Sequence, residues 1–313
     1  MTSQSWTSCR IPVKTVPYIY MSLIPAYPEF APLSLEMAQE ISPHMVKLPD
    51  GISEFSFTGL YLFRHRYNYR ASISGDLLIL SGERDGSRFF ITPCCSTGKE
   101  IVEKLFSDHD YWKLISPAFL EKNSQWMRDA GYEIQEDRNN FDYLYLRDDL
   151  AHLSGKKFHK KKNHVNAFLS SYPSWTIKDL NGETRKDALD VLEAWVLHEE
   201  EPQNTDYEAA HEVLSLMDHF PMTGQVLYVD GTPIAWTLAE TLGDGLISAV
   251  HFEKARTEYR GSYQFINYAY ARSLPDSIKY INREQDLGDE GMRQAKMTYR
   301  PSGFVMKYRV NRP

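Results

Sequence analysis

The chain has 313 residues, more than one typical domain, so the natural expectation is two domains of about 150 residues each. Its composition, 42% hydrophobic and 13% aromatic, is sufficient for well-packed cores and excludes a disordered protein. The net charge of -7 argues against a protein that binds nucleic acid over its whole surface, although a local basic patch can still bind phosphate groups.

The cysteines and the N-terminal stretch indicate the cellular compartment in which the protein is expected. Cys9, Cys94 and Cys95 form no CxxC pair and no disulfide framework, so we expect a reducing, cytoplasmic location. No apolar run approaches the roughly 20 residues that cross a bilayer. The apolar stretch 16–33 is interrupted by prolines that would break a signal-peptide helix. Residues 1–33 are therefore predicted to form an extended arm packed on the body.

The first half of the chain, residues 34–150, is predicted to contain helices, an antiparallel meander, and then alternating helices and strands. Apolar residues at helical spacing identify the helices, and alternating patterns identify the strands. The predicted helices are 34–45, 54–67, 98–106 and 117–130. The predicted strands are 69–73, 77–81, 88–92, 112–115, 132–135 and 143–146. The last two strands are expected to close the sheet of this half.

The second half, residues 174–313, repeats this order of elements without repeating the sequence. The predicted helices are 187–199, 208–220, 263–274 and 289–297. The predicted strands are 225–229, 233–241, 246–252, 277–281 and 302–310. A turn at Asp230-Gly231 predicts a hairpin between the first two of these strands. Residues 151–173 connect the halves and are predicted to be a basic linking helix.

Two segments resemble the signatures of a known family. Residues 155–166 read GKKFHKKKNHVN, and residues 282–301 read NREQDLGDEGMRQAKMTYRP. They are similar to segments of the family named for the C-terminal domain of phosphatidylglycerol lysyltransferase. Residues 53–67 and 141–145 also match, so that the resemblance covers roughly 35–311.

The resemblance implies an α/β (α+β) fold of two tandem GNAT-like domains, each a mixed, mainly antiparallel sheet flanked by helices. It also implies an aminoacyltransferase that moves an aminoacyl group from aminoacyl-tRNA to a hydroxyl or amine acceptor, such as the phospholipid phosphatidylglycerol. The second domain would carry the active site. Since no transmembrane segment is predicted, contact with an anionic lipid would be peripheral.

The loop before the helix 263–274 corresponds to the pyrophosphate loop of acetyl-CoA-dependent GNAT enzymes. Such a loop reads Q/R-x-x-G-x-G/A and binds pyrophosphate at a helix N-terminus. Here Glu258 would repel pyrophosphate, and bulky Tyr263 would block close approach of the backbone. We therefore expect no cofactor, and acyl-CoA enters only in the alternative of a GNAT-type N-acyltransferase. Arg260, Gly261 and Ser262 remain candidate substrate-binding residues.

A basic run is the candidate contact for tRNA or phosphate. It consists of Lys156, Lys157, His159, Lys160, Lys161, Lys162 and His164. In an acidic chain such a cluster favours electrostatic contact with a tRNA acceptor arm or an anionic lipid headgroup. The alternative is a solvated helix that links the halves and docks through its apolar residues.

The polar stretch 282–299 is the main candidate for the active site, because ligands bind at strand ends in open α/β sheets. Asp286 could bind the ammonium of the aminoacyl group, and Arg293 or Lys296 could bind a terminal phosphate or the developing oxyanion. Glu284 or Tyr299 could pass protons. The alternative is a structural ion-pair network that fixes the helix 289–297 to the sheet.

Two further residues are candidates for substrate binding. Asn282 precedes the acidic pair and would share its side of an extended segment. His251 lies in a strand where GNAT folds expose backbone to the acyl group, although a satisfied core histidine is the alternative. No metal is expected, because His198 has no second histidine in register for a zinc site. A GNAT-like module that binds an anionic ligand without catalysis is the non-enzymatic alternative.

Overall fold

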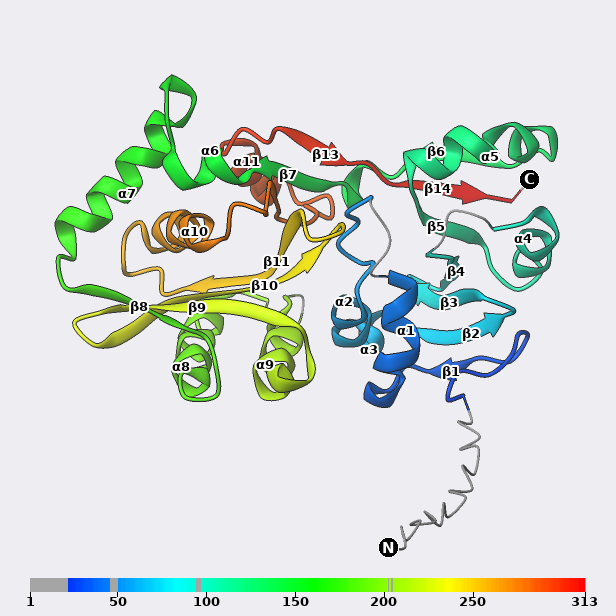
Figure 1. Cartoon of the computed structure of the whole chain (residues 1–313), viewed down its shortest axis with the longest axis horizontal. Coiled ribbons are helices and arrows are strands. Elements are labelled where there is room, and N and C mark those ends of the chain that lie inside the picture. The colour runs from blue at the N-terminus through cyan, green and yellow to red at the C-terminus, as the bar shows by residue number, and fades with distance from the viewer. Residues whose placement is uncertain (1–21, 46–49, 94–96, 202, 204, 313) are drawn as a thin grey trace, which may run out of the picture.

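The computed structural model describes residues 22–45, 50–93, 97–201, 203 and 205–312. Most of the predicted N-terminal arm and all three cysteines lie outside these residues. The described chain forms two mixed seven-stranded sheets flanked by helices (Figure 1). The predicted fold class of two tandem GNAT-like units is confirmed.

The first sheet, sheet A, has the strand order β1-β2-β3-β4-β5-β14-β6. Its strands are β1 (Ala31–Pro32), β2 (Arg70–Ser74), β3 (Leu77–Arg84), β4 (Ser87–Ile91), β5 (Tyr111–Ile115), β6 (Glu133–Glu136) and β14 (Tyr308–Asn311). The pair β4 and β5 is parallel, whereas the other pairs are antiparallel.

The second sheet, sheet B, has the strand order β13-β7-β12-β11-β10-β9-β8. Its strands are β7 (Asp142–Leu146), β8 (Trp175–Asp179), β9 (Met222–Val229), β10 (Thr232–Leu242), β11 (Ile247–Ala255), β12 (Tyr280–Asn282) and β13 (Gly303–Val305). Only β11 and β12 pair in parallel. The predicted turn at Asp230-Gly231 joins β9 to β10 with both residues at positive φ.

Helices cover both faces of each sheet. The α-helices are α1 (Ala38–Met45), α2 (Phe57–Leu62), α3 (Arg64–Tyr67), α4 (Lys99–Leu105), α5 (Pro117–Asp129), α6 (Arg147–His152), α7 (His159–Ser171), α8 (Arg185–Val196), α9 (Tyr207–Leu216), α10 (Ser262–Ser273) and α11 (Glu290–Met297). Short 3-10 helices are Leu35–Met37, Arg138–Asn140, Lys156–Phe158 and Met217–His219. Side-chain caps start several helices: Ser116 accepts a hydrogen bond from the backbone of Phe119, with Pro117 as the first helical residue.

The two halves exchange strands, which the sequence patterns did not predict. The strand β7 belongs to the first half of the chain but pairs with β12 and β13 in sheet B. The predicted strand 302–310 is two strands, and the second of these, β14, inserts between β5 and β6 of sheet A (Figure 1). The expectation that 143–146 closes the first sheet is therefore wrong. The predicted domain boundaries, after residue 150 and before residue 174, stay a prediction.

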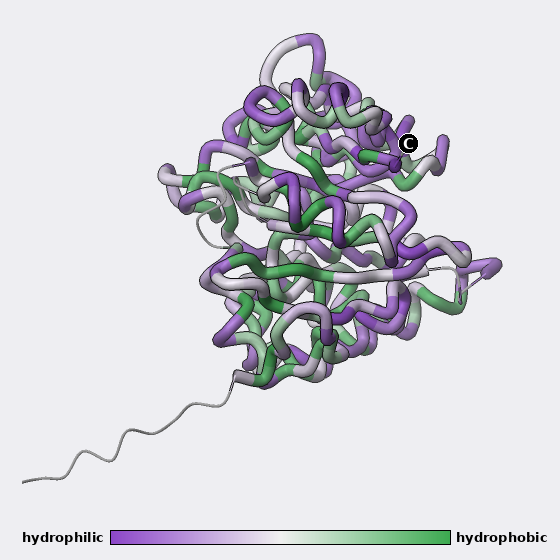
Figure 2. The backbone as a smooth tube through the Cα atoms, turned by 90° about the vertical axis from the view of Figure 1, so that its right-hand side faces the viewer, coloured by the Kyte–Doolittle hydropathy of each residue, from purple (hydrophilic) through white to green (hydrophobic). Residues whose placement is uncertain are grey.

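One apolar cluster runs through the junction of the halves. It includes Phe89 of sheet A, Phe57 of α2 and Trp236 of sheet B, all buried. The rings of Tyr61 and Phe220 lie 5.8 Å apart across this junction. Figure 2 shows hydrophobic segments along the strands in the interior and hydrophilic segments at the outer turns. The halves therefore share part of a single core.

A buried ion-pair cluster, the Lys307 cluster, lies where β13 leads into β14. The Lys307 side chain is 0% exposed, and its Nζ lies 2.6 Å from Oδ1 of Asp142 and 2.5 Å from Oε2 of Glu54. Burial alone would lower the pKa of Lys307, but these two carboxylates raise it, so the ammonium stays charged. Glu54 precedes α2, and Asp142 begins β7. One cation therefore joins three segments from both halves.

Removing this cation tests its role. Lys307→Met leaves two carboxylates in the interior without their partner, which typically costs about 3–5 kcal/mol. We expect the free energy of unfolding in urea at pH 7 to fall by about this amount. Lys122→Met, on the exposed surface of α5, is the matched control and should change it by less than about 0.5 kcal/mol. Equal effects of the two variants would contradict the role given to Lys307.

Candidate functional site

The candidate site lies where β11 and β12 part. The two strands pair over Ile247–Ala249 and Tyr280–Asn282 only. Beyond Asn282 the chain stays beside β7, where the backbone N–H of Arg283 donates to the carbonyl of Tyr143. The strand β11 continues to Ala255 without β12 beside it. Divergence of parallel strands is the usual place for ligands in such sheets.

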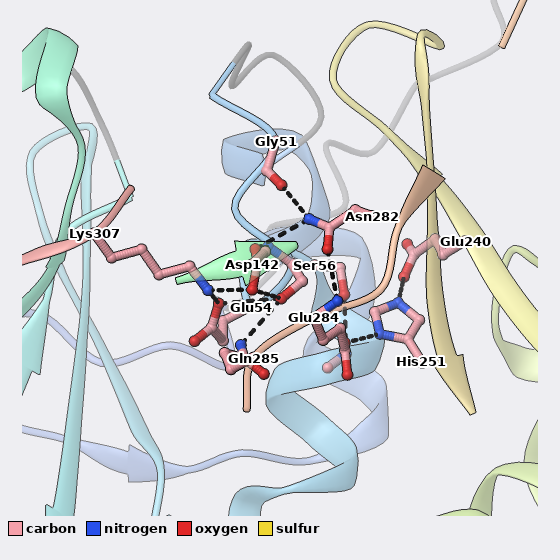
Figure 3. Close-up of polar contacts among 12 residues, drawn as sticks. Gly51, Glu54, Ser56, Asp142, Glu240, His251, Asn282, Glu284, Gln285 and Lys307 are labelled. Atoms are coloured by element: carbon pink, nitrogen blue, oxygen red, sulfur yellow. Dashed lines mark hydrogen bonds and ion pairs between the residues drawn. The ribbon is translucent and has the colours of Figure 1, made fainter. Parts of the chain in front are cut away.

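Asn282 links the Lys307 cluster to the point where β11 and β12 part (Figure 3). Its side-chain amide donates to the carbonyl of Gly51 at 2.9 Å and to Oδ2 of Asp142 at 3.0 Å. Its side-chain oxygen accepts from the backbone N–H of Glu284 at 2.8 Å. Asn282 is fully buried, and both its side-chain amide and its side-chain oxygen are hydrogen-bonded within the protein. Its contact with a substrate stays a prediction.

His251 lies between two carboxylates (Figure 3). Its Nδ1 is 2.7 Å from Oε1 of Glu284, and its Nε2 is 3.3 Å from Oε2 of Glu240 in an ion pair that is not aligned as a hydrogen bond. Burial alone would lower the pKa of His251, but the two neighbouring carboxylates raise it by more, and the resulting pKa is about 10. The ring is therefore an imidazolium at neutral pH.

Sequence analysis did not single out Glu240. The only available signal was a carboxylate in the otherwise apolar strand β10, where Ala239 precedes it and the strand is buried on both sides. The side chains of Glu240 and His251 are 9% and 3% exposed, whereas that of Glu284 is 23% exposed. Glu284 is thus the accessible end of a row of three titratable groups.

Asp286 is saturated by hydrogen bonds. Its Oδ2 accepts from Arg293 Nε at 2.9 Å, from the hydroxyl of Tyr143 at 2.6 Å and from Arg138 at 3.3 Å. Its Oδ1 accepts from Arg293 and from the backbone N–H of Gly288. Burial would raise its pKa, but these donors hold it well below the usual range. This geometry favours the alternative of a structural ion-pair network for Asp286 and Arg293, and Arg138 is a member that the sequence did not indicate.

The remaining candidates of the stretch are Lys296 and Tyr299. Lys296 donates to the carbonyl of Gln285, and burial lowers its pKa to about 8. The ring of Tyr299 lies 5.0 Å from the Arg283 guanidinium and 3.8 Å from the ammonium of Lys161, and burial raises the pKa of the tyrosine to about 12. Burial, with Arg283 nearby, lowers the pKa of Lys161 to about 8. The structure thus brings one lysine of the basic run to the candidate site.

The rest of the basic run faces solvent. Its exposed members are Lys156, Lys157, His159, Lys160, Lys162 and His164. The helix α7 docks on α10 through stacked rings of Phe168 and Phe265, whose centroids are 4.5 Å apart. The helix α7 therefore docks on the protein as expected for a linking helix, and it also presents a basic surface to solvent.

The loop before α10 is closed by the protein itself. Gly261 has φ 88°, and a Cβ atom at this position would lie 2.9 Å from the carbonyl oxygen of His164 in α7. Ser262 is buried and donates to the carbonyl of Arg256, whereas Arg260 is exposed. Close packing of α7 on this loop leaves little room for a pyrophosphate group.

Tyr263 closes the edge of β11 next to this loop. Its hydroxyl is hydrogen-bonded to the backbone of Ala255, the last residue of the strand, and burial raises its pKa. Further along the same strand, Glu253 forms an ion pair with Arg283 at 2.8 Å. The positions beside the free part of β11 are therefore held by the chain's own side chains.

Asp286→Asn tests the structural role of the saturated carboxylate. We expect the free energy of unfolding at pH 7 to fall by about 2–3 kcal/mol, because hydrogen bonds to a charged group are lost. Since the folded pKa is lowered, this contribution is present above the unfolded pKa of about 3.9 and is lost as the pH falls below it. The gap between wild type and variant, followed by urea unfolding, should therefore narrow below pH 4. Glu121→Gln on exposed α5 should show no such gap at any pH.

A membrane-spanning helix and a metal-binding group of side chains are both absent from the described residues. Within the described part of the chain, no helix combines the length and the apolar character needed to cross a membrane. Among the same residues, no three His, Cys, Asp or Glu side chains are grouped so that they could hold a metal ion.

Known proteins resemble this chain over most of its length. A conserved protein of unknown function from Bacteroides thetaiotaomicron VPI-5482 has a TM-score of 0.78 and 27% identity, over 91% of this chain and 99% of that chain. The L-PGS structure from Bacillus licheniformis has a TM-score of 0.54 and 12% identity, over 86% of this chain and 93% of that one. An uncharacterized protein from Mycoplasmoides gallisepticum is 26% identical over 192 residues, 59% of this chain, and the match spans 61% of the length of that relative.

A family model adds the assignment. The model described as phosphatidylglycerol lysyltransferase, C-terminal, matches residues 46–311, which includes both signature segments. The predicted resemblance is therefore confirmed, and the chain belongs to the phosphatidylglycerol lysyltransferase C-terminal family.

Proposed function

We propose that the protein is an aminoacyltransferase that takes its aminoacyl group from aminoacyl-tRNA and passes it to a hydroxyl or amine acceptor. The observation that carries the proposal is the position of Glu284 at the point where β11 and β12 part. Its carboxylate contacts His251, and its backbone N–H donates to the side-chain oxygen of Asn282. Membership of the family supports the reaction class.

The transfer needs no covalent enzyme intermediate. The acceptor oxygen or nitrogen attacks the carbonyl carbon of the aminoacyl ester, and a new ester or amide bond forms. The bond from that carbon to the ribose oxygen breaks, and the acceptor's proton ends on the ribose hydroxyl. The protein must therefore orient the donor and stabilise the charge that develops on the carbonyl oxygen.

We assign the binding of the donor's ammonium to Glu284 in place of Asp286. One oxygen of Glu284 faces His251, and among the described residues the other has no hydrogen-bond partner. Asp286 has no such free acceptor, and we propose that it and Arg293 fix the shape of the loop. Lys296 and Tyr299 remain candidates to stabilise the oxyanion and to pass the acceptor's proton.

The basic surface of α7 is proposed to contact the tRNA backbone. Its exposed lysines can neutralise phosphates, and Lys161 lies between this surface and Tyr299. An anionic lipid headgroup, as the acceptor's phosphate, would meet the same charges from a peripheral position.

The acyl-CoA alternative finds less support. Transfer from acyl-CoA would need the free part of β11 and the loop before α10 to be open to the donor. Here Tyr263 and the pair of Glu253 and Arg283 occupy this part of β11, and α7 packs on the loop at Gly261. Binding of CoA would require these groups to move.

Glu284→Gln is the direct test. We expect the rate of aminoacyl transfer or of deacylation from a panel of charged tRNAs to fall by about 100-fold, since the amide has no charge to bind the ammonium. Acid-gel analysis of the tRNA measures this rate. Glu258→Gln, an exposed residue of the loop before α10, is the matched control and should keep its activity. A wild-type protein that consumes no charged tRNA, together with a thermal shift on acetyl-CoA, would favour the acyl-CoA reaction. No response to either substrate would favour a non-catalytic module.

The basic surface gives a second prediction. Lys160→Glu combined with Lys162→Glu should weaken tRNA binding, and the slope of log Kd against log salt should flatten by about one for each lost phosphate contact. Fluorescence titration of labelled tRNA at several salt concentrations measures both quantities. Lys122→Glu combined with Arg128→Glu, two exposed residues of α5 at the opposite end of the molecule (Figure 1), changes the net charge by the same amount and is the control. An unchanged slope in the double variant would remove α7 from the interface.

A further inference from the structure

We infer that Glu240 and His251 are positioning residues that hold the Glu284 carboxylate in the orientation required for donor binding. This inference rests on the proposed function and adds to it Glu240, a residue remote from the substrate. The three side chains form a row that starts inside sheet B and ends at the point where β11 and β12 part (Figure 3).

A β-bulge puts His251 into this row. In the pairing of β10 with β11, Ala239 lies opposite Val250 and Leu238 lies opposite Phe252, so His251 has no residue opposite it. A bulge re-aims a side chain, and bulges are frequent beside active sites. The extra residue turns the imidazole toward both Glu240 on the neighbouring strand and Glu284 after β12.

The charges around the row show what Glu240 contributes. Two carboxylates flank the ring, and the ammonium of Lys296 in α11 is near enough to Glu284 to interact with its charge. The carboxylate of Glu240 keeps the imidazole protonated, and the protonated Nδ1 donates to Oε1 of Glu284. Without Glu240, the ring would keep only one carboxylate neighbour, and its pKa would fall toward the ordinary value.

Packing alone does not require these groups. Charges in the interior carry a desolvation penalty, and a pair of apolar side chains of similar volume often stabilises a protein as well or better. Glu240 Oε2 and His251 Nε2 are buried, and neither has a hydrogen bond in the described structure. The ion pair between them therefore lacks the alignment that would stabilise it most. Such an arrangement fits a role in orienting Glu284 better than a role in sheet stability.

Glu240→Gln is the critical variant. We expect kcat for transfer from aminoacyl-tRNA to fall about tenfold or more at pH 8, because a displaced Glu284 leaves the aminoacyl ester misplaced for attack. KM should change by less than about twofold, because the exposed lysines of α7 that we propose to bind the tRNA backbone are intact. The wild-type ring should stay protonated up to about pH 10, so its rate should show no loss from His251 below pH 9. The variant should lose further activity as the pH rises through the lowered pKa of its histidine. Glu240→Asp, which restores the charge, should recover part of kcat.

A second measurement does not depend on turnover. The ring of His251, assigned by comparison with His251→Asn, can be titrated by NMR in wild type and in Glu240→Gln. We expect imidazolium shifts from pH 6 to 9 in wild type and a titration within this range in the variant. Asp206→Asn removes the partner of buried Lys254 on the same strand and is the matched control, with kcat and titration unchanged.

The outcomes separate the inference from the proposed function. A wild-type protein that consumes no aminoacyl-tRNA overturns the proposed function, whatever the titration shows. An active wild type whose Glu240→Gln variant keeps its kcat and its pH profile overturns the inference alone. A loss of kcat in Asp206→Asn as large as that in Glu240→Gln also overturns it.

Discussion

The ammonium of Lys307, enclosed by Asp142 and Glu54, is the contact on which both the joining of the halves and the candidate site depend. Attraction between opposite charges is strong where water is excluded, so small shifts of these groups are costly. Asp142 also accepts from the side-chain amide of Asn282, and Asn282 accepts from the backbone of Glu284. The orientation of Glu284 is therefore tied to the packing of the two halves against each other.

Local chemistry was readable from the sequence, and partner choice was not. The helix start at Pro117 and the hairpin at Asp230-Gly231 were predicted because caps and turns depend on neighbours in the chain. An alternating pattern identifies a strand but carries no information on its partner, so the exchange of β7 and β14 was missed. At the site, the catalytic roles given to the stretch 282–299 and the phosphate contact given to Lys161 stay predictions. The nearby donors to Asp286, Arg293 and Gly288, could be anticipated from the sequence, whereas Arg138 and Tyr143 lie far away in the chain and could not.

Each sheet has a β-bulge in one strand of its parallel pair, in β5 of sheet A and in β11 of sheet B. The two bulges have different roles. In β5, Lys113 and Leu114 together face only Arg309 of β14, and Leu114 has φ 60°. The ammonium of Lys113 lies 5.1 Å from the ring of Tyr67, within the first core. In β11 the extra residue is His251, which reaches the candidate site. A similar backbone irregularity thus supports packing in one half and chemistry in the other.

The place of β14 also sets an order of events during synthesis. This strand fills the position between β5 and β6, yet in the chain it follows every strand of sheet B. Until it emerges, β5 and β6 have unpaired edges, and edges of this kind attract other chains. Completion of the first sheet therefore waits until all strands of sheet B have been made, and the first half cannot mature as an independent unit while the second is being made.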